Sequence, residues 1–165
     1  MEPKEEKAVW DAESSIRKYA DMVYRLAFAR TGSRSDADDI FQEVFLRFLQ
    51  EKKPFESEEH KKAWLIRVTL NCAKKLQASA WFRKTESLEE HLAYLEQICD
   101  TPREMELWQE LEKLKPKYRM VIHLFYYEGY SVEEMGKMLR QKPSTIRTWL
   151  TRARGQLKDI LEQEV

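Results

Sequence analysis

Apolar side chains recur three and four residues apart in the first part of the chain. Ile16, Tyr19, Val23 and Leu26 form the first such set, and Gly32 follows them. Residues at this spacing lie on one side of an α-helix, and glycine is favoured just after a helix ends. The pattern therefore predicts an amphipathic helix that ends near Gly32.

Two more amphipathic helices are predicted before residue 81. Ser35 is suited to cap the first of them, because the aspartates in the following turn would face the positive end of the helix dipole. The apolar face of this helix comprises Ile40, Phe41, Val44, Phe45 and Phe48. Pro54 interrupts the pattern, so we expect a loop at residues 52–59 and a third helix at about residues 61–80.

The second half of the chain has a similar pattern after Pro102. The apolar positions of its first two helices are Leu107, Leu111 and Leu114, then Tyr118, Val121, Ile122 and Phe125. Pro116 separates these two helices, and Gly129 ends the second of them. Residues 77–101 have weaker periodicity, so we interpret them as a linker that contains a short helix around residues 88–98.

A helix-turn-helix is predicted after Gly129. Ser131 and Glu134 have the spacing of a capping box, which starts a short helix. Residues 140–143 form the turn, and Ser144 can cap a longer helix that runs to about residue 160. The buried stripe of the longer helix would be Ile146, Leu150, Ala153 and Leu157. Gly136 provides a small residue where the second helix approaches the first.

The remaining face of the last helix suits the reading of duplex DNA. Arginine can donate two hydrogen bonds to guanine, threonine methyl groups can contact thymine, and flanking cations can hold phosphates. The candidate DNA-binding residues on this element are Lys142, Ser144, Arg147, Thr148, Thr151, Arg152 and Arg154. The alternative is a basic amphipathic helix that packs on its neighbours and leaves its arginines in solvent.

Charge is strongly segregated along the chain, although the net charge is zero. Residues 60–84 carry seven lysines and arginines and no acid, and residues 140–158 carry six and no acid. Residues 85–101 carry five acids and neither lysine nor arginine. Two basic surfaces separated by an acidic segment indicate two contacts with a polyanion such as nucleic acid.

Composition favours an all-α protein of two small helical domains joined by a flexible linker. The chain has 165 residues, of which only four are glycine and five are proline. We expect a first domain at residues 1–84, an acidic linker at residues 85–101 and a second domain at residues 102–165. No apolar run approaches the roughly 20 residues that cross a bilayer, and the N-terminus is charged. We therefore expect a cytoplasmic protein with no membrane insertion of its own.

The chain offers no constellation of residues for catalysis. It contains no nucleophile paired with a base and no Gly-rich phosphate loop. Cys72 and Cys99 lack the spacing of zinc ligands, and we interpret them as buried thiols rather than as a redox switch. We therefore expect no metal, no cofactor and no enzymatic activity.

Two groups of motifs resemble the sigma-70 family of RNA polymerase sigma factors. Its region 4 is similar to residues 118–119, 128–135, 144–148 and 152–154. Its region 2.2 is similar to residues 36–48, and its regions 2.3 and 2.4 are similar to residues 62–71. Two motifs in the family's order are a more specific signal than a helix-turn-helix alone. Because no region 3 separates them, the chain resembles the short extracytoplasmic-function (ECF) group.

The resemblance implies a subunit of RNA polymerase that directs promoter recognition and transcription initiation. In the family, region 4 binds the −35 promoter element as duplex, and region 2 captures and opens the −10 element. The implied partners are promoter DNA and core polymerase, through the clamp of its largest subunit and the flap of its second-largest subunit. ECF factors are commonly held inactive by an anti-sigma protein, often membrane-bound, so such a partner is implied as well.

The resemblance also assigns site residues in the first domain. Asp39, Gln42 and Glu43 match positions that meet the polymerase clamp, although acids there could also serve only to stabilise the first turn of their helix. The positions matched to −10 binding are Phe55, Lys62, Trp64, Arg67, Asn71, Lys74 and Lys75. The loop around Phe55 would receive an extruded base, whereas we interpret Trp64 as a core residue rather than a stacking platform.

Two other kinds of protein would share part of this pattern. A free-standing helix-turn-helix regulator could bind an operator as a dimer, but it would not need the motifs of the first domain. A helical interaction module could present its basic faces to an acidic protein, and it would then bind DNA without sequence preference. Association with core polymerase distinguishes a sigma factor from both alternatives.

Overall fold

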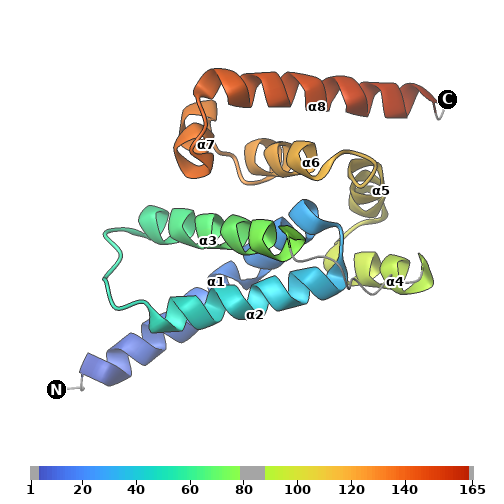
Figure 1. Cartoon of the computed structure of the whole chain (residues 1–165). Helices are drawn as coiled ribbons and strands as arrows, with labels where there is room; N and C mark the ends of the chain where they lie inside the picture. The colour runs from blue at the N-terminus through green and yellow to red at the C-terminus, as the bar shows by residue number, and fades with distance from the viewer. Residues whose placement is uncertain (1–3, 79–87, 164–165) are drawn as a thin grey trace.

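The structure is a computed structural model that describes residues 4–78 and 88–163, and all of its regular elements in those ranges are helical (Figure 1). The first domain contains α1 (Lys4–Thr31), α2 (Arg34–Gln50) and α3 (Glu58–Ala78), and the linker contains α4 (Leu88–Ile98). The second domain contains α5 (Pro102–Leu111), α6 (Pro116–Ile122), the π-helical turn η1 (His123–Tyr127), α7 (Val132–Leu139) and α8 (Pro143–Gln163). The predicted all-α fold is confirmed.

The first domain is a three-helix bundle in which each helix buries one apolar stripe. Val23, Leu26, Val44, Leu65 and Ile66 are almost completely buried between α1, α2 and α3. The predicted apolar spacing therefore corresponds to the core. Burial of such side chains stabilises a fold by about 1.5–3 kcal/mol each relative to exposure.

The turn between α1 and α2 differs from the prediction in its capping residue. Gly32 has a φ of +67°, a conformation that glycine adopts without strain, and its N–H donates to the Phe28 carbonyl at 2.7 Å. Ser33, not Ser35, is the N-cap of α2, because its hydroxyl accepts the N–H of Asp36 at 3.2 Å. Ser35 lies inside α2, which begins one residue after the actual cap.

The second domain forms the predicted helix-turn-helix. Both hydrogen bonds of the Ser131–Glu134 capping box are present, each at 3.1 Å. Arg140 takes a left-handed conformation at the turn, with a φ of 54°. The predicted cap at Ser144 is wrong: α8 begins at Pro143, a residue whose fixed φ suits the first position of a helix.

The second part of the predicted linker is a packed helix. The short helix expected around residues 88–98 is confirmed as α4, and Tyr94 and Leu95 on it are buried. The Tyr94 ring packs edge-on against Phe28 of α1, with 5.0 Å between ring centroids. The linker is therefore not a free tether from Leu88 onward, while residues 79–87 lie outside the described part of the chain.

The two domains lie directly against each other. In Figure 1, α6 lies between α8 and the helices of the first domain, and α1 contacts α6 while α3 contacts α7. Phe28 of α1 packs against Trp108 of α5 with a centroid separation of 5.4 Å, so the buried core continues from one domain into the other. The packing of the two domains therefore sets the position of the basic helix α3 relative to the basic helix α8.

Candidate nucleic-acid and polymerase interfaces

The helix-turn-helix exposes the face that the sequence assigned to duplex DNA. Ile146, Leu150 and Ala153 of α8 are buried, and Leu157 is partly buried. All seven residues predicted for duplex binding are either exposed or on the exposed turn before α8: Lys142, Ser144, Arg147, Thr148, Thr151, Arg152 and Arg154. The structure therefore leaves the whole predicted set accessible.

Several side chains on this face already have hydrogen-bond or ion-pair partners within the protein. The hydroxyls of Thr148 and Thr151 donate to the carbonyls one turn earlier, at 3.0 and 2.9 Å, which leaves their methyl groups as the part available to a base. Arg147 pairs with Glu133 of α7 at 3.0 Å, and both side chains are exposed. A surface pair of this kind contributes at most about 1 kcal/mol, so DNA can displace it.

Arg154, unlike the other six residues, contacts aromatic side chains of η1. Its Nε donates to the Tyr126 hydroxyl at 2.6 Å, and its guanidinium lies 5.6 Å from the Phe125 ring centroid. These contacts hold Arg154 against η1, two turns beyond Arg147. The sequence did not indicate this partner, because η1 and α8 meet only through the tertiary fold.

Lys117 is a further cation near α8 that the sequence analysis did not single out. Its ammonium lies 4.9 Å from the Trp149 ring centroid and 5.4 Å from that of Tyr118, and the residue is exposed. Cation–π contacts of this kind hold a lysine in a defined place at the start of α6. Lys117 is thus a candidate phosphate contact beside the predicted recognition helix.

The basic helix α3 presents three of the seven predicted −10 residues together on one exposed side. Arg67, Asn71 and Lys74 are exposed and are four and three positions apart, so they share a face. Lys62 lies five positions before Arg67, which places it on the opposite side of α3. Its Nζ lies 3.2 Å from Glu128 of the second domain. The structure therefore separates Lys62 from the group to which it was assigned.

Phe55 and Trp64 belong to one aromatic cluster at the start of α3. Phe55 stacks on Phe48 at 5.9 Å between centroids and meets the Trp64 ring edge-on at 5.5 Å. Trp64 is partly buried against the core, as the core interpretation predicted. The loop between α2 and α3 borders a pocket of about 500 Å³, lined by Phe48, Phe55 and the cations Lys52, Lys53 and Lys61 among others.

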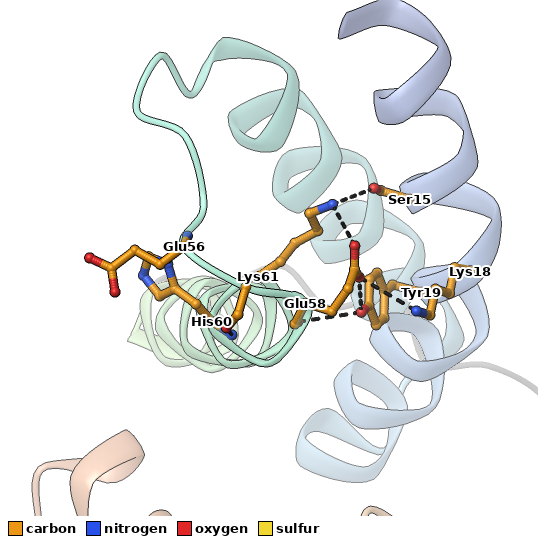
Figure 2. Close-up of polar contacts among 8 residues, drawn as sticks. Ser15, Lys18, Tyr19, Glu56, Glu58, His60 and Lys61 are labelled. Atoms are coloured by element: carbon orange, nitrogen blue, oxygen red, sulfur yellow. Dashed lines mark hydrogen bonds and ion pairs between the residues drawn. The ribbon is translucent and has the colours of Figure 1, made fainter. Parts of the chain in front are cut away.

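A polar network fixes the start of α3 next to this pocket (Figure 2). The Tyr19 hydroxyl donates to Glu58 at 2.6 Å, and the buried Lys61 ammonium donates to Glu58 at 3.2 Å and to Ser15 at 2.9 Å. Burial and the adjacent carboxylate raise the pKa of Tyr19 to about 12, and the hydrogen bonds from Tyr19 and Lys61 lower the pKa of Glu58 to about 2.

The loop itself is held by hydrogen bonds to its own backbone. Ser57 caps α3 by accepting the N–H of His60 at 3.0 Å. His60 Nδ1 in turn accepts the N–H of Glu56 at 3.1 Å, and Figure 2 labels both of these residues. These two bonds hold residues 56–60, which border the pocket, in one conformation. Sequence reasoning found Phe55 but missed Tyr19, Glu58 and Lys61, which come together from α1 and α3.

The residues predicted to meet the polymerase clamp are exposed on α2. Asp39, Gln42 and Glu43 share an accessible surface, and Glu43 pairs with Arg47 at 2.9 Å. Asp39 and Glu43 line a hollow of about 310 Å³, and Lys75 of α3 lines the same hollow. Lys75, predicted as a −10 contact, is therefore placed next to the predicted polymerase surface.

Both cysteines are free thiols in partly or fully buried surroundings. Cys72 of α3 is buried and lines the same hollow as Asp39 and Glu43. Burial raises the pKa of its thiol. Burial also raises the pKa of Cys99 to about 11. Thiols with raised pKa values remain protonated near neutral pH, which favours the interpretation of both residues as inert packing groups.

An apolar groove crosses the second domain on a surface that the sequence did not reveal. The groove has a volume of about 710 Å³ and is lined by Leu107, Leu111, Ile122, Tyr126, Arg154, Leu157, Lys158 and Glu162. Leu107 and Tyr126 are 52% and 59% exposed, which is unusual for large apolar side chains grouped in one place. The charged residues that line the groove all belong to α8.

The described residues thus form two helical domains, one with a helix-turn-helix and the other with a basic helix. Residues 15–83 match the family model for Sigma-70 region 2, and residues 104–157 match that for Sigma-70, region 4. The chain belongs to the sigma-70 family, and its curated relatives are factors of the ECF group. The resemblance in the motifs is thereby confirmed.

Several relatives and solved structures are similar over nearly the whole chain. The ECF RNA polymerase sigma factor SigE of Mycolicibacterium smegmatis is 31% identical over 160 residues, which cover 92% of this chain and 61% of SigE. SigW of Bacillus subtilis is 28% identical, with 87% of this chain and 84% of SigW covered. The chain therefore spans about three fifths of the length of SigE.

Among solved structures, the fold is similar to that of the sigma factor RpoE of Bartonella quintana in complex with the anti-sigma factor NepR. The TM-score is 0.68 at 18% identity, with 92% of this chain and 97% of that chain covered. CnrH in complex with the cytosolic domain of CnrY has a TM-score of 0.64 at 22% identity, and 93% and 89% are covered. At these identities the similarity concerns the fold alone.

Proposed function

We propose that this protein directs core RNA polymerase to a set of promoters and initiates transcription there as an ECF sigma factor. The observation that carries the proposal is the presence of two separate cationic helix faces, one on each domain, in the order of regions 2 and 4. The face on α8 would read the −35 element in the major groove. The bond-forming chemistry of RNA synthesis belongs to the polymerase.

The first domain would capture and open the −10 element. Arg67, Asn71 and Lys74 lie on one exposed side of α3, where they can follow a single strand. The pocket beside Phe55 combines an aromatic ring with nearby lysines, and these are the groups that stack a base and attract its phosphate. Because its loop is already ordered, an extruded base would meet a preformed site, which lowers the cost of flipping.

Two surfaces would dock the protein onto core polymerase. Asp39, Gln42 and Glu43 on α2 offer carboxylates and an amide to basic residues of the clamp. The apolar groove between α5 and α8 suits a helix with an apolar face, and we assign it to the flap of the second-largest subunit. The two contacts lie on different domains, so each domain would be held separately.

An anti-sigma protein is proposed as the regulator of this activity. One of the similar folds is that of a sigma factor in complex with such a protein, RpoE with the anti-sigma factor NepR. In the described part of the chain, no helix is long and apolar enough to cross a membrane. We propose that the protein acts in the cytoplasm and that any attachment to the membrane comes from the anti-sigma partner.

Run-off transcription tests the proposed function. The purified protein is mixed with core polymerase on a library of genomic fragments, and the start sites are sequenced. We expect starts preceded by two shared sequence elements at a fixed spacing. A protein that directs core polymerase to no start site, in the absence of any inhibitor, is not a sigma factor. Binding to one operator as a dimer, without transcription, would identify a helix-turn-helix regulator instead.

A further inference from the structure

The turn of the helix-turn-helix holds an arginine where the backbone favours glycine. Arg140, the residue after α7, has a φ of 54° and a ψ of 45°, which lie in the left-handed region. A side chain is strained there because its Cβ comes close to the following carbonyl oxygen, whereas glycine has no Cβ. Among the described residues, every other positive φ belongs to a glycine. Arg140 is therefore held in a conformation that costs free energy.

The close approach of the turn to α7 imposes this conformation. The N–H groups of Arg140 and Gln141 both donate to the Gly136 carbonyl, the second at 2.9 Å, and these bonds end α7. A Cβ at Gly136 would lie only 2.8 Å from the Gln141 carbonyl oxygen, so the turn is packed against the helix. A left-handed residue at position 140 lets the chain reverse tightly into α8. Glycine would serve this purpose without strain.

No polar contact within the protein accounts for an arginine at this position. Its side chain is exposed and makes no hydrogen bond, ion pair or ring contact with any residue that the structure describes. By contrast, Arg147 pairs with Glu133, and Arg154 donates to Tyr126. Strained conformations cluster at ligand-binding sites, where the side chain has a use that offsets the strain. An exposed and unpaired arginine in a strained turn therefore indicates a ligand from outside the chain.

The place of the turn beside α8 defines the chemistry of that ligand. Arg140 lies three residues before Pro143, where α8 begins, and it opens the stretch 140–158 that contains no acid. A helix with its side chains is about 10–12 Å across and the major groove is about 12 Å wide, so α8 would fill the groove. The turn that leads into α8 would then pass over one wall of the groove, which is built of phosphates. A guanidinium matches the geometry of a phosphate with paired hydrogen bonds.

We propose that Arg140 binds a backbone phosphate of the duplex that α8 reads, and that this contact is why the turn carries a strained arginine. The proposal rests on the proposed function of α8, and it adds a residue that the sequence analysis did not assign to DNA. A phosphate is the same beside every base pair, so the contact positions α8 without reading sequence. Arg140 thus differs from Arg147, whose place on α8 suits a base edge.

The variant Arg140→Gly tests the proposal, because stability and DNA binding should change in opposite directions. The midpoint of thermal unfolding should rise by about 2–4 °C, since glycine takes the left-handed conformation without strain. Fluorescence anisotropy measures the affinity of the full chain for two labelled duplexes of unrelated mixed sequence over a series of salt concentrations. Both affinities should fall about eightfold at about 0.1 M salt, and the slope of log K against log salt should be smaller by about one.

Two further variants serve as controls. Arg140→Lys keeps a cation in the same turn and should keep the salt slope of the parent protein, whereas Arg103→Gln removes a charge from an exposed position on α5 and should change neither slope nor affinity. The proposal is overturned if Arg140→Gly keeps the parent's affinity and slope, lowers the midpoint of unfolding, or weakens binding to one duplex only. It is also overturned if Arg103→Gln has the same effect or if the parent binds neither duplex. A failure to direct transcription, with the expected binding changes present, would remove the proposed function and leave the phosphate contact standing.

Discussion

Tyr19 of α1 donates a 2.6 Å hydrogen bond to the Glu58 carboxylate at the start of α3, and this bond joins two helices that are 39 residues apart in sequence. Tyr19 is only 6% exposed, whereas Glu58 is mostly exposed. The bond therefore orders the beginning of α3 from its buried side. It also positions the loop that carries Phe55 next to the proposed −10 pocket.

The variant Tyr19→Phe should lower the free energy of unfolding by about 1 kcal/mol, because it removes this bond and leaves the ring in place. Urea denaturation at neutral pH measures the change. Arg17→Ala, which removes an exposed pair with Glu13 on the same helix, is the control and should change stability by less than about 0.5 kcal/mol. Equal effects of the two variants would show that the Tyr19 bond contributes nothing beyond a surface contact.

Ionised Glu58 should stabilise the fold, so the free energy of unfolding should fall as the pH is lowered into the acid range. Its pKa in the folded protein is lowered to about 2 by hydrogen bonds from Tyr19 and Lys61, below the ordinary 4.5. A depressed folded pKa contributes stability that is complete above the unfolded value and is lost as pH falls from about 4.5 toward 2. Because the carboxylate is more than half exposed, solvent screening reduces the size of the effect.

Glu58→Gln should therefore destabilise the protein at pH 7 more than at pH 3. Urea denaturation of variant and parent at both values gives the comparison. Glu13→Gln on α1, whose carboxylate pairs with Arg17 on the surface, serves as the control with the same change of charge. If the free energies of unfolding of variant and parent differ by the same amount at both pH values, Glu58 does not contribute to the loss of stability in acid.

Periodicity was sufficient to predict the helices, but not every residue that starts them. Ser33 and Ser35 are both followed by acids, so composition alone did not choose between them. The left-handed Gly32 directs the chain so that Ser33 is extended, with a φ of −131°, and its hydroxyl meets the N–H of Asp36. The cap was therefore decided by the preceding turn, which the periodic pattern does not contain.

The site was predictable where it lies along one helix and not where it depends on tertiary contacts. The exposed face of α8 follows directly from its buried stripe. Lys62 was grouped with Arg67 because both lie in the stretch that resembles regions 2.3 and 2.4, although a period of 3.6 residues already places them about 140° apart around the helix. The contacts between the domains have no local signal, since Arg25 of α1 pairs with Glu104 of α5 and Arg119 of α6 donates to the Ala29 carbonyl of α1.

Arg147→Ala should relax the sequence preference at one position of the −35 element, at a cost of about 1–3 kcal/mol in discrimination. The reason is that an exposed arginine in the first half of α8 can reach a guanine edge once Glu133 releases it. Binding to a panel of single-base variants of the promoter measures this effect. Uniform weakening on every sequence would instead make Arg147 a phosphate contact.

Asp39→Ala/Glu43→Ala should weaken the association with core polymerase while the fold stays intact. Both residues are exposed on α2, so their loss creates no cavity. Pull-down with core polymerase and circular dichroism give the two readouts. Glu13→Ala/Glu106→Ala removes the same charge elsewhere and should leave core binding unchanged. Loss of helicity in the first variant would show that these acids stabilise α2 rather than form an interface.

Gly136 and Gly155 provide a matched pair of glycines within helices. A Cβ at Gly136 would lie 2.8 Å from the Gln141 carbonyl oxygen in the turn, whereas a Cβ at Gly155 would meet nothing within 4 Å. In a helix, alanine is favoured over glycine by about 1 kcal/mol. At Gly155 only this preference acts, so Gly155→Ala should stabilise the protein by about 0.5–1 kcal/mol.

At Gly136 the clash opposes the same preference. The backbone of the turn must move to admit a methyl group, and overpacking of this kind costs about 1–3 kcal/mol. Gly136→Ala should therefore lower the midpoint of thermal unfolding, and it should also weaken duplex binding because the turn sets the angle between α7 and α8. Calorimetry and binding to promoter duplex measure the two effects. If both substitutions raise the midpoint of thermal unfolding by the same amount, the turn can move to admit the methyl group. The close approach of Gly136 to Gln141 is then not required for the helix-turn-helix.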